Sequence, residues 1–174
     1  ESLIRDRINK LTPEYFILSE EDSSQNKTNF EIARESDWVW HIDPLDGTNN
    51  FLSGWDHFAV SIALSFKDEL QLAVVYAPAR NEFYYAQKGS GAFLKLDGAP
   101  KEQLHVKNYT KNNFDRSFFV TCLNSLAEGN KKKLDVLFRI NTESLSVRRL
   151  GAAALDLSLV ARGVFDGFWE QGLK

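Results

Sequence analysis

Two aspartates stand three positions apart in the segment WHIDPLDGTNNF, which covers residues 40–51. Pro44 fixes its own φ angle and biases the preceding residue toward an extended conformation. We therefore expect Asp43 to end a strand with its side chain projecting, and Asp46 to lie across the turn that follows. Two convergent carboxylates are the oxygen ligands that hard divalent cations prefer, so the segment indicates a metal site.

The residues directly after this pair suit a phosphate group. Gly47 allows the backbone to come close to a ligand, and Thr48 brings a hydroxyl next to backbone N–H groups. We expect these N–H groups to open a helix at residues 49–50, and a helix start of this kind binds anions. Carboxylates for a cation beside N–H groups for an anion predict a site for a metal-bound phosphate.

A purely structural role for the same residues carries about equal weight when they are taken alone. Asp-Pro is an ordinary turn pair, and Asp46 is a suitable N-cap for a short helix. Glu20 and Glu21 change this balance. They lie in the segment YFILSEED at residues 15–22, directly after its mainly apolar first part. Two acidic strand ends in one fold repel each other unless a cation lies between them, which favours the metal site.

The elements that must position these residues are mostly short strands in the first two thirds of the chain. Residues 2–11 have the pattern of a helix, and the polar, aperiodic residues 23–37 are expected to form a mobile loop. Short turns join a series of β-rich runs, which is typical of an antiparallel meander. These runs are residues 38–42, 57–66, 70–77, 82–88 and 91–96.

After about residue 113 the pattern changes to alternating strands and helices, which indicates a layered, partly parallel second sheet. The expected strands are residues 117–123, 145–150 and 165–170, and the expected helices are residues 130–140 and 151–163. The fold class is therefore α+β, with an antiparallel meander sheet and a second, mixed sheet that the chain's end truncates. We expect an N-terminal metal-binding part over 1–112 and the start of a C-terminal part over 113–174.

Composition restricts the class of protein. The 174 residues are 43% hydrophobic and 26% charged, a profile typical of globular domains. The formal net charge of −3 gives no strong sign of nucleic-acid binding, and no apolar run is long enough for a membrane span. The single cysteine, Cys122, lies in an apolar strand, where we expect an inert core thiol and, by default, a reducing compartment.

The segment DPLDGTNNF resembles the aspartate-rich signature of the inositol monophosphatase superfamily of Mg²⁺-dependent, often lithium-sensitive phosphatases. Three further regions resemble the same family in the same order, and the likeness is nearest to its bacterial inositol-1-monophosphatase branch. They are FILSEED, the central run HFAVSIAL with AVVYAPARNEFYYAQKGSGAF, and RRLGAAALDLSLVARGVFDGFWEQGLK. The resemblance implies a layered αβαβα sandwich.

The resemblance also implies roles for individual residues around the metals. Glu20 matches a glutamate that binds the first metal and helps to activate water, and Asp43 matches the carboxylate that bridges the metals. Leu45 matches a position whose backbone carbonyl is a ligand, and Asp46 matches a ligand of the second metal. Thr48, whose hydroxyl orients the attacking water in the family, is a second catalytic candidate beside Glu20.

Substrate contacts follow from the resemblance in the same way. Gly47 and Thr48 match an N–H pair that binds phosphate, and Asp46 is also expected to face the substrate. Glu170 matches a glutamate that receives hydroxyl groups of the substrate. The start of the predicted second-sheet helix matches a further substrate contact, made by Gly151, Ala152 and Ala153.

The chain departs from the family pattern in several places. An upstream Asp-x-Val-Thr-x-Asp motif and a downstream Pro-Trp-Asp motif, which supplies a ligand of the second metal, are both missing, and there is no Met. We therefore expect the chain to be part of a longer protein. Ser19 replaces the usual Gly before the glutamate pair, and Ala152 stands where some members have Thr, so this chain lacks a hydroxyl that contacts substrate in those members.

Taken together, these features predict a phosphoric monoester hydrolase that splits a small polyol phosphate, such as inositol monophosphate, with metal-activated water. Mg²⁺ is the expected cofactor, with two or three ions per site in the intact protein. Fructose-1,6-bisphosphatase, nucleotide 3′-phosphatase and a non-catalytic interaction protein that keeps the fold are the alternatives. We expect a small phosphorylated substrate, a homodimer, a cytoplasmic location and no membrane partner, and the sequence gives no strong sign of nucleic-acid binding.

Overall fold

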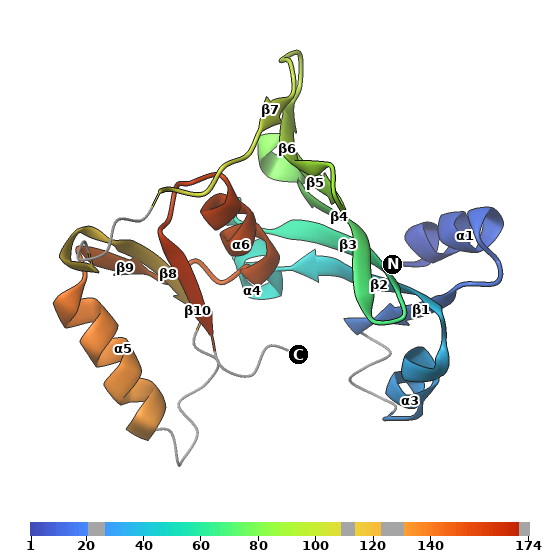
Figure 1. Cartoon of the computed structure of the whole chain (residues 1–174), viewed down its shortest axis with the longest axis horizontal. Coiled ribbons are helices and arrows are strands. Elements are labelled where there is room, and N and C mark those ends of the chain that lie inside the picture. The colour runs from blue at the N-terminus through green and yellow to red at the C-terminus, as the bar shows by residue number, and fades with distance from the viewer. Residues whose placement is uncertain (21–26, 109–113, 123–130, 171–174) are drawn as a thin grey trace. The chain divides into compact units, whose positions relative to one another are not determined.

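The structure, a computed structural model, describes residues 1–20, 27–108, 114–122 and 131–170. It consists of two compact units, each with its own sheet (Figure 1). The first unit combines Glu1–Asp46 with Ala59–Gln103, and the second combines Gly47–Phe58 with Leu104–Lys174. The division into domains at residue 112 stays a prediction.

The helices and strands follow the chain in an order close to the expected one. In the first unit they are α1 (Ser2–Leu11), β1 (Phe16–Ser19), α3 (Lys27–Glu35), β2 (Trp38–Asp46), β3 (Ala59–Phe66), β4 (Glu69–Ala77), η1 (Pro78–Arg80), β5 (Glu82–Gln87), β6 (Gly91–Leu96) and β7 (Glu102–Gln103). In the second unit they are α4 (Thr48–Leu52), η2 (Phe114–Arg116), β8 (Phe118–Cys122), α5 (Lys131–Glu143), β9 (Ser146–Arg148), α6 (Ala153–Ala161) and β10 (Gly167–Glu170).

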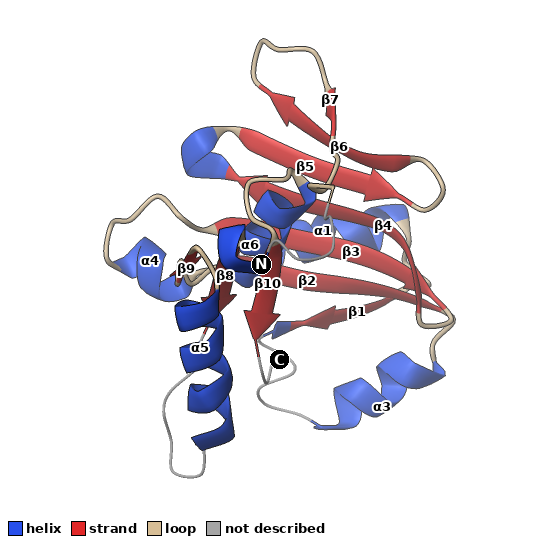
Figure 2. Ribbon diagram, turned by 60° about the vertical axis from the view of Figure 1, so that its left-hand side comes forward, coloured by secondary structure: helices blue, strands red, loops and turns tan. Residues whose placement is uncertain are grey.

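The sheet of the first unit has seven strands in the order of the sequence, from β1 to β7. All neighbours from β2 to β7 pair antiparallel, so the predicted meander is confirmed, and Figure 2 shows its central strands side by side. The β1–β2 pair is parallel, which makes the sheet mixed. A parallel pair needs a crossover connection, and α3 lies on this connection.

The expected mobile loop at residues 23–37 is wrong where α3 is present. Ala33 is buried, and Asn29, one turn earlier, is half-buried, so one narrow side of the helix packs against β1. This contact line is too short to produce an apolar period in a polar segment, which explains why the sequence pattern did not indicate a helix. Residues 23–26 lie outside the described residues.

The core of the first unit forms where α1 covers the parallel strand pair. Ile8 of α1, Ile17 of β1 and Ile42 of β2 are buried together, and Trp40 packs at their side. The indole Nε1 of Trp40 donates a hydrogen bond to Thr12 Oγ1 at 3.1 Å, which ties the helix end to β2. These contacts fix the two strands that carry the predicted metal ligands.

The sheet of the second unit has the strand order β10-β8-β9, and both pairings are parallel. The chain crosses from β8 to β9 through α5 and returns past β8 to β10 through α6. Because parallel crossovers are right-handed as a rule, two crossovers in opposite directions place their helices on opposite faces of a sheet, and Figure 1 shows α5 and α6 on different sides of these strands. The core lies under α6, where Val120, Leu159 and Phe165 are buried together. The α+β class with two sheets is thus confirmed, although the described strands of the second sheet show no antiparallel pairing.

Among the described residues, no helix combines the length and the apolar character that crossing a bilayer requires.

Candidate active site

The parallel pairing of β1 and β2 brings two predicted metal ligands to the same edge of the sheet. Ser19 is opposite Ile42 in the register, so Glu20 and Asp43 directly follow two paired residues. Neighbouring strands lie about 4.8 Å apart. Glu20 is exposed and Asp43 is half-buried, so both carboxylates are at an accessible strand end.

The expected turn between Asp43 and Asp46 is wrong, because β2 continues through both residues. The register with β3 shifts between them, and this irregularity accommodates Pro44, which has no N–H group for a ladder hydrogen bond. The Leu45 amide donates to Asp43 Oδ1 at 2.9 Å instead of pairing with β3 at a regular position. The irregular strand end therefore holds the three predicted ligands within four positions.

The donor set at this edge fits a hard divalent cation. Carboxylate and carbonyl oxygens of Glu20, Asp43, Leu45 and Asp46 are the ligand types that Mg²⁺ takes. Within the residues that the structure describes, no three His, Cys, Asp or Glu side chains form a cluster that already has the geometry of a metal site. The assignment of these four residues to a metal thus stays a prediction, supported by ligand chemistry and strand register.

The second unit begins with the predicted phosphate-binding turn. Gly47 has a φ of +89°, and α4 starts at the next residue, Thr48, one position before the helix start expected at residues 49–50. A Cβ atom at Gly47 would lie 2.9 Å from the carbonyl oxygen of His57 and 3.0 Å from Cβ of Ala152, so no larger residue fits. Thr48 is exposed at the start of α4, where the first N–H groups have no partner within a helix.

The start of α6 lies against this turn within the second unit. Gly151 has a φ of +82°, and the side-chain amide of Asn50 lies 3.5 Å from the place of a Cβ atom there. Ala152 is fully buried, whereas Ala153 is half-buried. Burial favours a packing role for Ala152, and its predicted contact with substrate stays untested.

Glu170 is the last residue of β10 and is half-buried. It pairs with Cys122 at the end of β8, so it lies at the carboxyl edge of the parallel strands. Thr121 Oγ1 donates a hydrogen bond to the carbonyl oxygen of Trp169, which adds a side-chain link between the two strands. Ligands in open parallel sheets bind beyond such carboxyl edges.

The predicted site residues thus fall into two groups. Those expected to bind metal belong to the first unit, and those expected to bind phosphate and substrate belong to the second. The peptide bond between Asp46 and Gly47 joins the two groups covalently. The first group consists of Glu20, Asp43, Leu45 and Asp46, and the second group consists of Gly47, Thr48, Gly151, Ala152, Ala153 and Glu170.

Sequence reasoning missed a buried pair next to these residues. Nε2 of His57 lies 2.7 Å from Asp156 Oδ1, and both side chains are almost inaccessible to solvent. Asp156 was available as a signal, because it interrupts the apolar run GAAALDLSLVA at a position that faces the core. An acidic residue there requires a polar partner.

Two other polar side chains, those of His41 and Cys122, have structural partners. His41 Nε2 lies 2.9 Å from Ser65 Oγ, and burial lowers the pKa of His41 while Asp68 opposes the shift. Cys122 donates through Sγ to Asp156 Oδ2 at 3.4 Å. Burial, with the Asp156 charge second, raises the pKa of Cys122 to about 12, as an inert thiol requires.

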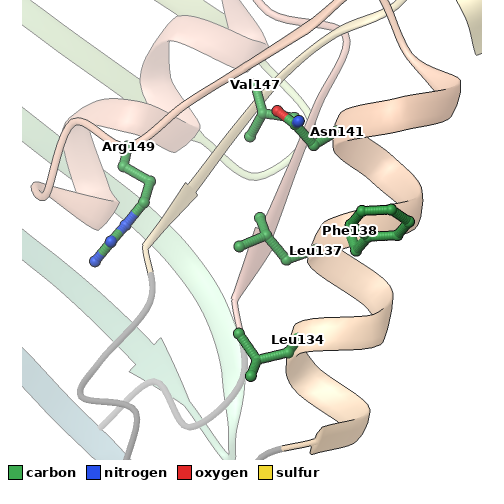
Figure 3. Close-up of a pocket in the computed structure, with 6 residues that line it drawn as sticks. All are labelled: Leu134, Leu137, Phe138, Asn141, Val147 and Arg149. Atoms are coloured by element: carbon green, nitrogen blue, oxygen red, sulfur yellow. The ribbon is translucent and has the colours of Figure 1, made fainter.

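A cavity of about 400 Å³ in the second unit lies between α5 and β9 (Figure 3). Apolar side chains of α5, including Leu134 and Leu137, project into it. Its described lining residues include no predicted site residue and no carboxylate for a cation.

The protein is thus of the α+β class. Its candidate metal site lies at the strand ends near Glu20 and Asp43, and its candidate phosphate site lies at the start of α4, directly after Gly47. The chain belongs to the inositol monophosphatase family, whose family model matches residues 1–174.

Individual relatives agree with this assignment. The chain is 39% identical to the inositol-1-monophosphatase of Rhizobium meliloti over 174 residues, which cover 99% of this chain and 60% of that protein. It is 37% identical to the Nus factor SuhB of Escherichia coli strain K12, over 100% of this chain and 61% of that protein. The solved structure of Mycobacterium tuberculosis SuhB matches with a TM-score of 0.83 at 29% identity, covering 99% of this chain and 64% of that one. The chain thus spans about three fifths of the length of these relatives.

Proposed function

We propose that the full-length protein is a Mg²⁺-dependent phosphomonoesterase that hydrolyses a small polyol phosphate, such as inositol monophosphate. The observation that carries this proposal is the parallel register of β1 and β2, which brings Glu20 and Asp43 to one strand edge. Membership of the family and similarity to an inositol-1-monophosphatase support it.

In this proposal Glu20, Asp43, Asp46 and the carbonyl oxygen of Leu45 hold Mg²⁺. When bound, the cation supplies Lewis-acid chemistry for water and for the phosphate oxygens. The protein's own residues bind and orient the substrate around this centre.

The N–H groups of Gly47 and Thr48 bind the phosphate, since a helix start favours an anion. The hydroxyl of Thr48 orients the attacking water, and Glu20 accepts its proton. The carboxylate of Glu170 accepts hydrogen bonds from hydroxyl groups of the leaving alcohol, and this contact selects a polyol. Lithium sensitivity, a cytoplasmic location and a homodimer are part of the same proposal.

The test is a panel of phosphate esters assayed with the full-length protein, with Mg²⁺ and with the cation removed by a chelator. We expect inositol monophosphate to be hydrolysed faster than fructose 1,6-bisphosphate or a nucleoside 3′-phosphate, and turnover to stop without Mg²⁺. A preference for either of the latter esters would assign the protein to another branch of the superfamily. Undiminished turnover in the chelator would contradict the metal-dependent reaction.

A second candidate function is an interaction protein that keeps the fold without turnover. Similarity to a protein named Nus factor SuhB favours this candidate. The same panel separates the two: a folded full-length protein that hydrolyses none of the esters with Mg²⁺ would favour the interaction protein.

A further inference from the structure

A buried polar pair joins two segments of the second unit that are far apart in the sequence. Nε2 of His57 lies 2.7 Å from Oδ1 of Asp156, and their side chains are 1% and 0% exposed. Polar groups buried to this extent are costly unless they are paired, so the two side chains require each other. Because His57 precedes β3 and Asp156 lies in the first turn of α6, the pair links these two positions.

Further contacts hold both side chains in one orientation. Cys122 Sγ donates to the second oxygen of Asp156, Oδ2, at 3.4 Å. The ring of Trp55 stacks on the imidazole of His57 with centroids 5.5 Å apart and planes at 29°. The pair therefore has contacts on both of its sides, as a rigid support requires.

Asn50 makes a second link between the same segments. Its Nδ2 donates to the carbonyl oxygen of His57 and to that of Leu150, each at 2.7 Å. Leu150 directly precedes Gly151, where the predicted substrate-contacting residues begin. One amide group thus connects the α4 segment to the entry of α6.

The His57–Asp156 pair and the Asn50 hydrogen bonds both lie next to the two predicted ligand-binding stretches, Gly47–Thr48 and Gly151–Ala153. The carbonyl oxygen of His57 and Cβ of Ala152 limit the space at Gly47 to a hydrogen atom, since a Cβ atom would lie 2.9 Å and 3.0 Å from them. The amide of Asp156 donates to the carbonyl oxygen of Ala152 at 2.8 Å. A shift of His57 or Asp156 would therefore move the Gly47 turn relative to the start of α6.

We propose that His57, Asp156 and Asn50 are positioning residues that hold the Gly47–Thr48 turn against Gly151–Ala153. This inference rests on the proposed phosphatase function, in which the two stretches bind the phosphate and the substrate. In this proposal the three side chains act by fixing the distance between the groups that bind the phosphate and the substrate. A misplacement of about 1 Å in such an arrangement lowers the rate by roughly 10²-fold.

The experiment compares variants of the full-length protein. His57→Leu removes the ring donor, and His57→Gln restores an N–H donor near the place of Nε2. Asn50→Ala removes both carbonyl links without leaving a charge buried. The matched control is Asp166→Asn, which weakens another carboxylate contact of the second unit, where Asp166 Oδ2 accepts from the Phe118 amide at 2.7 Å and from Lys107 Nζ at 3.2 Å.

The readouts are kcat, KM, the dissociation constant of inorganic phosphate with Mg²⁺ by calorimetry, and the Mg²⁺ concentration for half-maximal activity. We expect His57→Leu and Asn50→Ala to weaken phosphate binding and to lower kcat/KM by about 10²-fold. The Mg²⁺ requirement should stay unchanged, because its predicted ligands belong to the first unit. His57→Gln should recover most of the loss, and Asp166→Asn should lower Tm without changing phosphate affinity.

Wild-type phosphate affinity in folded Asn50→Ala would overturn the proposal, even if His57→Leu does not fold. If the wild-type protein neither hydrolyses esters nor binds phosphate, the proposed function fails, and hydrogen exchange of residues 47–58 decides on the positioning role. Faster exchange in Asn50→Ala than in Asp166→Asn supports it, and equal exchange overturns it.

Discussion

Cys122 Sγ lies 3.4 Å from Asp156 Oδ2, so the single thiol of the chain shares its carboxylate with His57. Burial is the main cause that raises the pKa of Cys122 to about 12, and the Asp156 charge adds to it. A thiolate at this position would meet a carboxylate in a poorly solvated environment, which disfavours the ionised form.

We expect this thiol to make stability depend on alkaline pH. The ordinary pKa of the group is 9.0 and the folded-state pKa is about 12, so the unfolded chain loses the proton first. The stabilisation is complete below pH 9 and decreases as the pH rises toward 12, because the folded state then binds more protons than the unfolded state. Urea unfolding of wild type and Cys122→Ala between pH 8 and 11 measures it, and the difference between the two should shrink with rising pH. A constant difference would contradict the raised pKa.

Reactivity provides a second measure of the same group. Since the thiolate is the nucleophile, the native protein should react with iodoacetamide far more slowly at pH 8 than the urea-unfolded chain. Equal rates for the native and the unfolded protein would show that the Cys122 thiol ionises normally in the fold.

Gly47→Ala should destabilise the protein more than Gly54→Ala. Both glycines have positive φ angles, +89° and +73°, so alanine is strained at either position, by about 1–2 kcal/mol. Of these two glycines, only Gly47 has neighbours within 3.0 Å of a Cβ atom, whereas nothing lies within 4 Å at Gly54, so overpacking adds about 1–3 kcal/mol at Gly47. Urea unfolding of both variants gives the two losses, and equal losses would show that the close contacts at Gly47 relax without cost.

Local patterns predicted the antiparallel part of the fold well, because alternation and turn residues act over a few positions. The strands β3 to β6 lie within a residue or two of the expected runs. The helix α3 was missed because, among its described side chains at residues 28–35, only Ala33 is buried, and one buried residue leaves no period to detect. Asp43 was expected to end a strand before Pro44, but the register shift with β3 lets β2 continue to Asp46.

Prediction of the candidate site from local sequence patterns was limited in the same way. Residue types and spacing indicated Asp43, Asp46 and the glycine turn, since these signals lie within a few positions of each other. The pairing of His57 with Asp156 spans 99 positions, so no local pattern contains it. Such contacts group Gly47–Phe58 with the second unit, although this segment connects two strands of the first sheet.

Asp43→Asn should abolish turnover, because it removes a negative charge from the predicted cation site while it keeps the size of the side chain. We expect kcat/KM of the full-length protein to fall by more than about 10²-fold, and Mg²⁺ binding by calorimetry to weaken with it. The control is Asp37→Asn. Asp37 directly precedes β2, and its exposed carboxylate lies 3.9 Å from Lys67 Nζ. An exposed ion pair of this kind contributes little, so the control should keep wild-type kinetics. Near-normal activity of Asp43→Asn with Mg²⁺ would remove this residue from the metal site.

Glu170→Gln should change substrate preference more than chemistry. Glu170 ends β10 at the carboxyl edge of the parallel sheet, and in the proposed function it accepts hydrogen bonds from vicinal hydroxyl groups of the leaving alcohol. Losing one hydrogen bond to a charged group costs about 1.5–3 kcal/mol, which lowers kcat/KM for a polyol phosphate by roughly 10- to 150-fold. An aryl phosphate has no such hydroxyl groups, so its kcat/KM should hardly change.

The kinetics of both substrates in the full-length protein measure this preference, with Glu143→Gln as the matched control. Glu143 is an exposed glutamate of the same unit, whose Oε1 lies 3.2 Å from Arg139 Nε on α5, and its replacement should affect neither substrate. A matching loss on both substrates in Glu170→Gln would place Glu170 in the catalytic machinery. No loss on any polyol phosphate would instead mean that the leaving alcohol is recognised by other residues, because the carboxylate would then have no hydroxyl partner in the transition state.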